Sequence, residues 1–332
     1  MKKIAIIGAG GQTGTMFAFE LRNAAEILGI GREKEVRMIE EEKLYVARAG
    51  KFPELFKEKV IRDVEFQERD APDIIFLTTK NPVSSPVRYY YQKFKDRGKI
   101  PALLISQNGI AALSEAKETL KEIFGKDSEK IRLIRMVLFN PIDKRKVEDK
   151  IYIRYSRPIR ITIAKATGNR DIGDVVEIFR RAGFEVKEFP STQVRNLEFS
   201  KLFLNLIGMA AASRGFSIED GFKNKEIFGE EIESLREYIR VVKASDGEFL
   251  NFPYYPVKFL SILLGWPPIS FLLFFRNIIA RIVSQTRGRK PKVLDEIDYY
   301  NGAVVNLGKK IGVKTPINEI IYERALRKLR KI

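Results

Sequence analysis

The stretch KKIAIIGAGGQTG, from Lys2 to Gly14, decides how this chain folds. Its first half is a short apolar run with β-branched residues, which predicts a strand. Glycines then interrupt the run, and Thr15 to Ala24 follow an amphipathic pattern, which predicts a helix. A strand that passes through a glycine turn into a helix points free backbone N–H groups at a pyrophosphate. We therefore expect a dinucleotide-binding turn at the start of the chain.

The glycine spacing departs from the usual G-x-G-x-x-G pattern. Counted from Gly8, the third glycine would stand where the chain has Thr13, and Gly14 follows it. The turn can be read as Gly8, Gly10 and Gly14, or as Gly8, Gly11 and Gly14, and a plain tight turn is the alternative. The predicted cofactor-binding loop consists of Gly8, Gly10, Gly11, Gln12, Thr13 and Gly14.

Apolar runs alternate with helical patterns through the first half of the chain. This alternation predicts a doubly wound α/β sheet. The second half, from about Val194, shows helical patterns without strand patterns, so we expect two domains, residues 1–190 and 191–332. The predicted strands are 4–8, 26–30, 73–78, 102–106, 133–139, 151–154, 159–164 and 184–186, and the predicted helices include 15–24, 113–124, 171–182, 196–214, 225–250 and 296–311.

The composition excludes several kinds of chemistry. The chain has no Cys, which excludes disulfides, a thiolate nucleophile and cysteine-bound metals, and it has no His. We therefore expect no metal site, and proton transfer must come from Lys, Tyr, Asp or Glu. No signal peptide is visible, so the cytoplasm is the expected compartment.

The formal net charge of +17 has several possible explanations. A positive field attracts anionic cofactors and carboxylate substrates. Many Lys, Arg and Glu residues without Cys are also typical of thermophile surfaces. A membrane surface could attract the basic clusters. Nucleic acid is not an expected partner, because no pattern of a nucleic-acid-binding module is present.

Three polar residues follow predicted strands where α/β proteins bind ligands. Arg32 comes after the second strand, about twenty residues beyond the glycines, and a guanidinium there suits the 2′-phosphate of NADP. Glu33 beside it is the residue type that NAD-binding turns use, and an ordinary solvated arginine is the alternative. Lys80 and Asn108 follow two later strands. Each is either a ligand contact or an ordinary loop residue.

The segment from Phe259 to Phe275 is apolar throughout and carries no charge. It is at the lower limit of length for a membrane span, and Gly-Trp-Pro-Pro interrupts it at 265–268. We expect two short helices joined by a turn, forming a buried hairpin or a dimer interface. Peripheral membrane contact is the alternative, because basic residues follow closely.

These landmarks, taken in order, resemble the ketopantoate reductase (2-dehydropantoate 2-reductase) family. The resemblance covers the glycine turn, Arg32, the strand that ends in Lys80 and the turn Gln107-Asn108-Gly109. In the second half, KLFLN at 201–205 is similar to the family's K-L-x-x-N, EIDYYNGAVV at 296–305 to its E-I-D-x-x-N-G-x-V-V, and TPIN at 315–318 to its T-P-x-N.

The resemblance implies a fold, a reaction and site residues. The fold would be a Rossmann-like domain followed by an all-α domain like the C-terminal domain of 6-phosphogluconate dehydrogenase. The reaction would be NADPH-dependent reduction of ketopantoate to pantoate, by a homodimer with the site between its two domains. Lys201 would be the general acid and Glu296 the carboxylate partner of the substrate hydroxyl. Lys80 would contact the cofactor, while Asn108 and Asn205 would position substrate or cofactor.

Two positions depart from the family pattern. The family has a second Asn where this chain has Met209, and the surroundings of its serine are not preserved around Ser284, which has the matching spacing to Glu296. We assign Ser284 to the substrate site on spacing alone. The departures favour, as alternatives, another bulky 2-oxo acid or an NADP-binding protein without turnover that docks to a membrane or partner through 259–275.

Overall fold

The computed structural model describes residues 1–287 and 291–330, apart from the side chains of Glu68 and of 284–287. The chain divides into two compact units. The first consists of Met1–Gln107 with Ala112–Val194, and the second of Asn108–Ala111 with Arg195 onward. Each unit has its own core and is described separately.

The first unit is built on a mostly parallel sheet, as the alternating pattern predicted. Its eight strands lie in the order β12-β11-β8-β7-β6-β1-β2-β5, and only β8 and β11 pair antiparallel. The strands are β1 (Lys3–Ile7), β2 (Glu26–Gly31), β5 (Val60–Arg62), β6 (Ile74–Leu77), β7 (Ala102–Ile105), β8 (Leu133–Leu138), β11 (Arg160–Thr167) and β12 (Glu185–Phe189).

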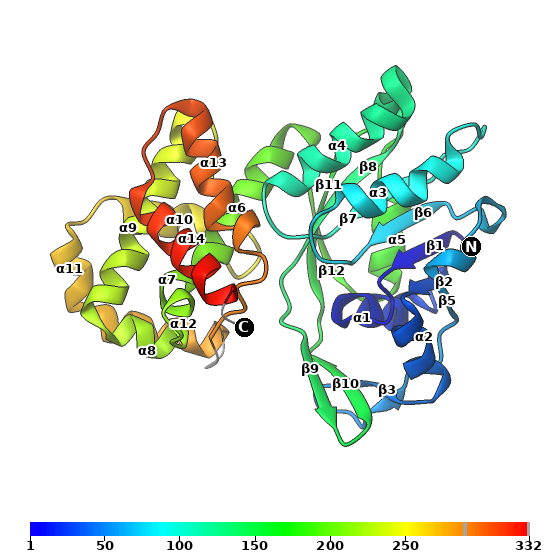
Figure 1. Ribbon diagram of the computed structural model, residues 1–332, viewed down its shortest axis with the longest axis horizontal. Coiled ribbons are helices and arrows are strands. Elements are labelled where there is room, and N and C mark those ends of the chain that lie inside the picture. The colour runs from blue at the N-terminus through cyan, green and yellow to red at the C-terminus, as the bar shows by residue number, and fades with distance from the viewer. Residues whose placement is uncertain (288–290, 331–332) are drawn as a thin grey trace. The chain divides into compact units, whose positions relative to one another are not determined.

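Helices cover both faces of this sheet, and Figure 1 shows α3 and α4 on one side and α1 on the other. The central strands are buried on both faces, which explains their continuous apolar sequence. The helices of this unit are α1 (Gln12–Leu21), α2 (Glu33–Glu40), α3 (Ser84–Tyr91), α4 (Ala111–Phe124) and α5 (Gly173–Arg181).

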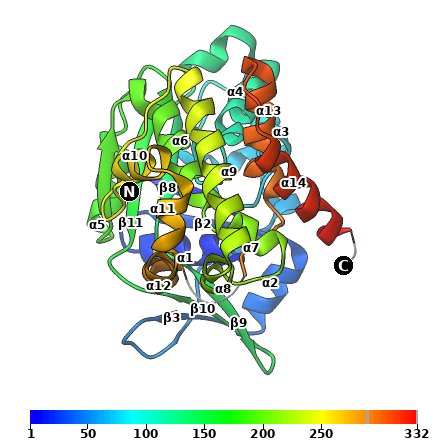
Figure 2. The same ribbon diagram turned by 90° about the vertical axis from the view of Figure 1, so that its left-hand side faces the viewer.

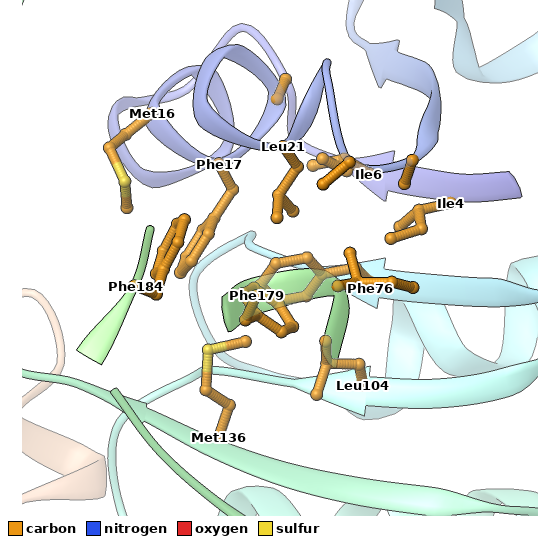
Figure 3. Packing of buried hydrophobic residues seen from close by; sticks show 14 of the residues in the cluster. Ile4, Ile6, Met16, Phe17, Leu21, Phe76, Leu104, Met136, Phe179 and Phe184 are labelled. Carbon is orange, nitrogen blue, oxygen red and sulfur yellow. The ribbon is translucent and has the colours of Figure 1, made fainter. Parts of the chain in front are cut away.

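An aromatic cluster fixes α1 on the sheet (Figure 3). Phe17 of α1 is stacked on Phe184 at 5.8 Å between ring centroids and meets Phe76 of β6 edge-on at 4.7 Å. Phe179 of α5 packs edge-on against the same rings. Fully burying a phenylalanine contributes about 1.5–3 kcal/mol, so this cluster holds the start of α1 at the end of β1.

A small second sheet was not predicted. It has the order β4-β3-β10-β9, and only 151–154 within it was expected to be a strand. The hairpin strand β9 reads DKRKV and is exposed throughout, so it carries no apolar alternation that could reveal it. The strands are β3 (Leu44–Arg48), β4 (Glu54–Leu55), β9 (Asp143–Val147) and β10 (Lys150–Tyr155).

The second unit is helical, and no strand is assigned in its described residues. The predicted helix 196–214 is interrupted at Gly208, whose φ of 92° is left-handed, so α6 ends before it and α7 begins after it. The predicted helix 225–250 ends at Ala244. The helices are α6 (Val194–Leu206), α7 (Met209–Ser213), α8 (Ile218–Lys223), α9 (Lys225–Ala244), α10 (Val257–Gly265), α11 (Ile269–Phe274), α12 (Arg276–Arg287), α13 (Asn301–Ile311) and α14 (Pro316–Leu329).

Two buried carboxylates on α9 cap neighbouring helices. Glu231 accepts hydrogen bonds from the backbone N–H groups of Gly208, at 2.6 Å, and Ala210, at 3.1 Å, where α7 begins. Glu237 accepts from the N–H groups of Ile317 and Asn318, both at 2.9 Å, in the first turn of α14. A carboxylate at a helix N-terminus satisfies orphan donors and complements the helix dipole. The central helix thus fixes the starts of two others.

Replacing Glu231 with glutamine should flatten the pH dependence of stability. Burial raises the pKa of Glu231 from 4.5 to about 7, against the opposing effect of its hydrogen bonds and of Lys292. Because the folded state holds this proton more tightly than the unfolded state, the resulting stability is fully present below pH 4.5 and is lost as pH rises through about 7. The loss is on the order of 3 kcal/mol.

Denaturant unfolding at a series of pH values between these limits measures this effect. We expect the E231Q variant to be less stable than the wild type at the acidic end, and this difference should shrink toward the alkaline end. The exposed Glu323 supplies the control, since E323Q should follow the wild-type curve. Parallel curves for E231Q and wild type would contradict the protonation argument.

Candidate functional site

The glycine turn is held by contacts that exclude side chains. Gly8 has a φ of 87°, and its N–H donates to the carbonyl of Ile30 at 2.8 Å. A Cβ on Gly14 would lie 2.1 Å from the carbonyl oxygen of Gly8, so α1 approaches the turn at a distance that only glycine allows. Gly10 lies against the side chain of Glu35 in the same way. The structure therefore requires glycine at 8, 10 and 14, the first of the two spacings.

A pocket of about 710 Å³ opens beside this turn. The helix α1 starts at Gln12 with no side-chain cap on Gly11, so its first-turn N–H groups remain available to an anion. Six of the predicted cofactor residues line the pocket: Gly8, Gly11, Gln12, Thr13, Arg32 and Lys80. Gly10 and Gly14 act instead through the backbone approach described above.

The pocket carries opposite charges at one end. The guanidinium of Arg32 donates to Glu35 Oε1 at 2.6 Å, and the backbone N–H of Arg32 donates to Glu35 Oε2 at 3.0 Å. This hydrogen bond raises the pKa of Arg32, whose guanidinium is a cation in any case. Glu33 does not line the pocket, because its carboxylate accepts hydrogen bonds from Arg37 and Arg62. The acidic residue that pairs with Arg32 in the pocket is therefore Glu35.

Sequence reasoning missed several residues that line the pocket. Thr78 and Thr79 follow β6, and the Thr78 hydroxyl donates to the carbonyl of Ile7 at 2.7 Å, which ties the tips of β6 and β1 together. The position of these two threonines just before Lys80 could have revealed them. The other missed residues lie on elements without a distinctive sequence pattern. These other lining residues are Glu35, Asp63, Ser85, Pro86, Tyr89, Tyr90 and Lys144.

These residues fit a nicotinamide dinucleotide. Backbone N–H groups at a helix start suit its pyrophosphate. Because Gly14 has no side chain, none stands between the turn and the helix start. The cations Arg32, Lys80 and Lys144 line the pocket and offset the negative charge of the cofactor. Among the described residues there is no group of three or more acidic side chains arranged to hold a metal ion.

A polar cluster lies in the second unit around Glu296. Its Oε2 accepts from the Asn108 amide at 3.3 Å and from the Tyr300 hydroxyl at 3.0 Å. Burial, and then the charge of Glu296, raise the pKa of Tyr300, so this hydroxyl stays a donor. The structure therefore brings together Asn108 and Glu296, which lie far apart in sequence. Asn108 belongs by its contacts to the second unit and does not line the pocket of the first.

The local structure at Glu296 differs from our expectation. Glu296 does not begin an α-helix, because it precedes a 3₁₀ turn over Ile297–Tyr299, and α13 starts only at Asn301. Gly109 explains the close packing here. It has a φ of 94°, and a Cβ on it would lie 2.8 Å from the Tyr299 backbone oxygen. The turn that carries Asn108 can therefore pack directly on the 3₁₀ turn that follows Glu296.

The helix α6 carries the other two predicted residues. Lys201 is half-buried, Asn205 is buried, and the two lie four residues apart on one face of the helix. The amide nitrogen of Asn205 is buried and has no hydrogen-bond partner in the structure. A buried donor without a partner costs about 1–3 kcal/mol, so it marks a place where a ligand oxygen would be stabilised.

The departures from the family pattern lie nearby. Met209 is the first residue of α7 and is buried, beyond the break at Gly208. Lys292, which sequence reasoning did not single out, donates to the Asn205 carbonyl at 2.6 Å and braces the end of α6. Ser284 lies in α12, but its side chain lies outside the described part of the structure.

Two sequence profiles of one family match the chain. The profile described as ketopantoate reductase PanE/ApbA matches residues 4–136, and the one described as ketopantoate reductase PanE/ApbA C terminal matches residues 275–328. Together they cover more than half of the chain and include Arg32, Lys80, Asn108 and Glu296. No curated protein matches the chain in sequence.

Solved structures share the fold over nearly the whole chain. A PanE/ApbA family ketopantoate reductase from Ralstonia eutropha JMP134 is similar with a TM-score of 0.72 and 19% identity, over 97% of each chain. A D-mandelate dehydrogenase, solved with NADH and anilino(oxo)acetate, has a TM-score of 0.71 and 17% identity over 98% of each chain. A 2-dehydropantoate 2-reductase from Methylococcus capsulatus has a TM-score of 0.65 and 17% identity, over 99% of this chain and 96% of its own.

At these identities the solved structures show a common fold, a Rossmann-like unit followed by a helical one. The two profiles go further, because they match in sequence both the strand-rich start and the helical end. The chain belongs to the ketopantoate reductase PanE/ApbA family of oxidoreductases.

Proposed function

We propose that this protein reduces 2-dehydropantoate (ketopantoate) to pantoate with NADPH, a step of pantothenate and coenzyme A biosynthesis. Residues 1–190 would bind the cofactor and residues 191–332 the substrate, and we expect a cytoplasmic homodimer. The family membership supports a nicotinamide-dependent reduction. The observation that carries the substrate side is the carboxylate of Glu296, held by Asn108 and Tyr300 in the unit that also contains Lys201 and Asn205.

The reaction adds a hydride to the carbonyl carbon and a proton to its oxygen. The reduced nicotinamide supplies the hydride when it is bound. Lys201 supplies the proton, because an ammonium stabilises the negative charge that develops on the carbonyl oxygen and can then protonate it. The lysine afterwards takes a proton back from solvent. In a chain without His, a lysine is the natural general acid.

The other proposed site residues hold the substrate. Glu296 accepts a hydrogen bond from the hydroxyl of the substrate, and its orientation is set by Asn108 and Tyr300. The amide nitrogen of Asn205 donates to a substrate oxygen, which gives that buried donor the partner it lacks within the protein. We keep Ser284 as a candidate substrate contact on its spacing to Glu296.

Removing the ammonium of Lys201 should abolish most turnover. We expect K201A to lower kcat for ketopantoate roughly 10²- to 10⁴-fold, because positioned proton transfer contributes a factor of that size. The measurement is NADPH consumption, followed by its absorbance. K310A, a change of an exposed lysine on α13, should retain wild-type rates.

A second variant separates the role of Glu296 from that of Lys201. E296Q keeps the size of the side chain but removes the charge, so it should lower turnover while E323Q does not. If K201A and E296Q both reduce ketopantoate at the wild-type rate, the assignment of Lys201 and Glu296 to the reaction is wrong. NADPH binding that persists in the wild type without turnover of any 2-oxo acid would instead favour a non-catalytic, cofactor-binding protein.

Arg32 should set the preference for NADPH over NADH. Its guanidinium can form paired hydrogen bonds with the 2′-phosphate, and Glu35 orients it from the pocket side. We expect R32A to lower kcat/KM for NADPH roughly tenfold or more and to leave that for NADH nearly unchanged. The neighbouring exposed lysine gives a matched control, K34A, which should keep the wild-type ratio.

The ratio of the two kcat/KM values is the readout, so a general loss of activity does not imitate the effect. A wild-type protein that prefers NADH would contradict the NADPH assignment and leave the reductase assignment standing. Equal losses with both cofactors in R32A would mean that Arg32 supports the fold of the pocket rather than the phosphate.

A different bulky 2-oxo acid is the second candidate substrate. Met209 favours it, because a buried apolar side chain stands where the family pattern has a polar one. The D-mandelate dehydrogenase fold relative, solved with anilino(oxo)acetate, shows that this fold accommodates an aryl-bearing ligand. A panel of 2-oxo acids should therefore rank differently for M209N, with a gain for ketopantoate relative to aromatic acids. An unchanged ranking would remove Met209 as a determinant of specificity.

A further inference from the structure

The segment from α10 to α12 packs on the helical unit with one face. Figure 2 shows these helices beside α8 and α9. The inward side chains include Leu272 of α11 and Ala280 of α12, which join a cluster with Phe228 and Ile232 of α9. In α10, Val257 and Ser261 are the buried residues. The core of this region is therefore complete without the outward faces of these helices.

The outward faces are apolar as well. On α10 and the turn after it, Phe259, Ile262, Leu263 and Trp266 follow helical spacing and are exposed, Trp266 to 88%. A second exposed row continues from α11 into α12 through Phe271, Phe274, Ile278 and Ile282, with Phe274 exposed to 81%. The prediction of a buried hairpin is therefore wrong for this chain by itself. Soluble monomers rarely expose so many large apolar side chains together, so this face is an interaction surface.

The charges of the segment select its partner. From residue 249 to 294 every charged residue is Lys or Arg, although Asp and Glu number 43 in the whole chain. Lys258 and Arg281 are exposed beside the two apolar rows. A second copy docked by this face through a two-fold axis would bring two cationic faces without any Asp or Glu from this segment together, which is unfavourable. An anionic partner removes that repulsion.

The length of the helices indicates how they would contact an anionic membrane. Among the described residues, no helix has the length and apolar character needed to cross a bilayer. Short helices with an apolar outer face and neighbouring cations suit the plane of a membrane interface instead. Trp266, at the turn between α10 and α11, is the residue type that concentrates at the boundary between headgroups and acyl chains.

We infer that the outward face of α10, α11 and α12 docks onto an anionic phospholipid surface. The apolar rows enter the headgroup boundary, while Lys258 and Arg281 meet lipid phosphates. The inner faces of the same helices keep them attached to α8 and α9, so docking requires no unfolding of the helical unit. This surface is additional to the reductase site and does not depend on the substrate of that site.

Vesicle flotation of the full-length protein tests the inference. The wild type should float with vesicles of phosphatidylcholine and phosphatidylglycerol but not with phosphatidylcholine alone, and added salt should weaken binding. The double variant W266S/F274S should bind roughly tenfold or more weakly, because two large apolar groups no longer leave water. The control F52S/V64S removes two comparably exposed apolar residues of the first unit and should float as the wild type does.

Circular dichroism and thermal unfolding show whether each variant is folded, and the charge reversal K258E/R281E gives an independent second test. That variant should lose the preference for phosphatidylglycerol. The inference is overturned if the wild type does not float with either vesicle, or if W266S/F274S floats as well as the control. It is also overturned if light scattering shows that the wild type is a dimer which only W266S/F274S dissociates, since a second copy would then cover this face.

Discussion

The close contact between the carbonyl oxygen of Gly8 and the backbone of Gly14 is the constraint on which the cofactor pocket depends. Because no side chain stands between them, α1 can begin directly at the end of β1, and its first N–H groups face the pocket. The aromatic cluster around Phe17 then holds the helix in that position from the other side. A bare turn and a helix start together suit an anion without a dedicated cation, and in the proposed function Arg32 adds the charge that selects NADPH.

In the helical unit, two buried carboxylates of α9 fix the starts of two other helices. Glu231 fixes the start of α7, and Glu237 fixes the start of α14 together with the Asn318 amide, which donates to it at 2.8 Å. Since α7 follows α6 after the break at Gly208, the first of these contacts also fixes the end of the helix that carries Lys201 and Asn205. The positions of the proposed substrate residues therefore depend on a buried ionisable group that the reaction does not use.

Much of this architecture could be predicted from the sequence, because its central strands and helices are defined by local patterns. The glycine turn, the parallel strands and the change to helices after about Val194 all follow from apolar periodicity. The pattern did not reveal β9, whose side chains are all exposed, nor the break at Gly208, where the backbone is left-handed and a Cβ would lie 2.5 Å from the side chain of Ile218. Local sequence patterns also cannot reveal the contact of Asn108 with Glu296, since only the fold brings residues so distant in sequence together.

Glu35 could not be predicted as the acidic partner of Arg32 for a related reason. Glu33 stands closer to Arg32, but the direction of α2 turns Glu33 toward Arg37 and Arg62 and leaves Glu35 in the pocket.

The absence of histidine gives the positive charge of this chain a chemical meaning beyond surface composition. A 2-oxo acid and a nicotinamide dinucleotide are both anions, so the same lysine and arginine side chains that attract them can also do the work for which other oxidoreductases use histidine. A lysine ammonium offers a proton and a positive charge to a carbonyl oxygen at once, whereas a neutral imidazole offers an N–H donor without the charge. The attraction of an anionic partner by positive charge also accounts for the segment between 249 and 294. There, cations lie beside apolar residues, and the segment has no Asp or Glu. On an ordinary charged surface, Lys and Arg are interspersed with Asp and Glu. The exclusion of Asp and Glu from one continuous stretch therefore points to a partner whose own charge is negative and whose surface is partly apolar, which is the description of an anionic bilayer.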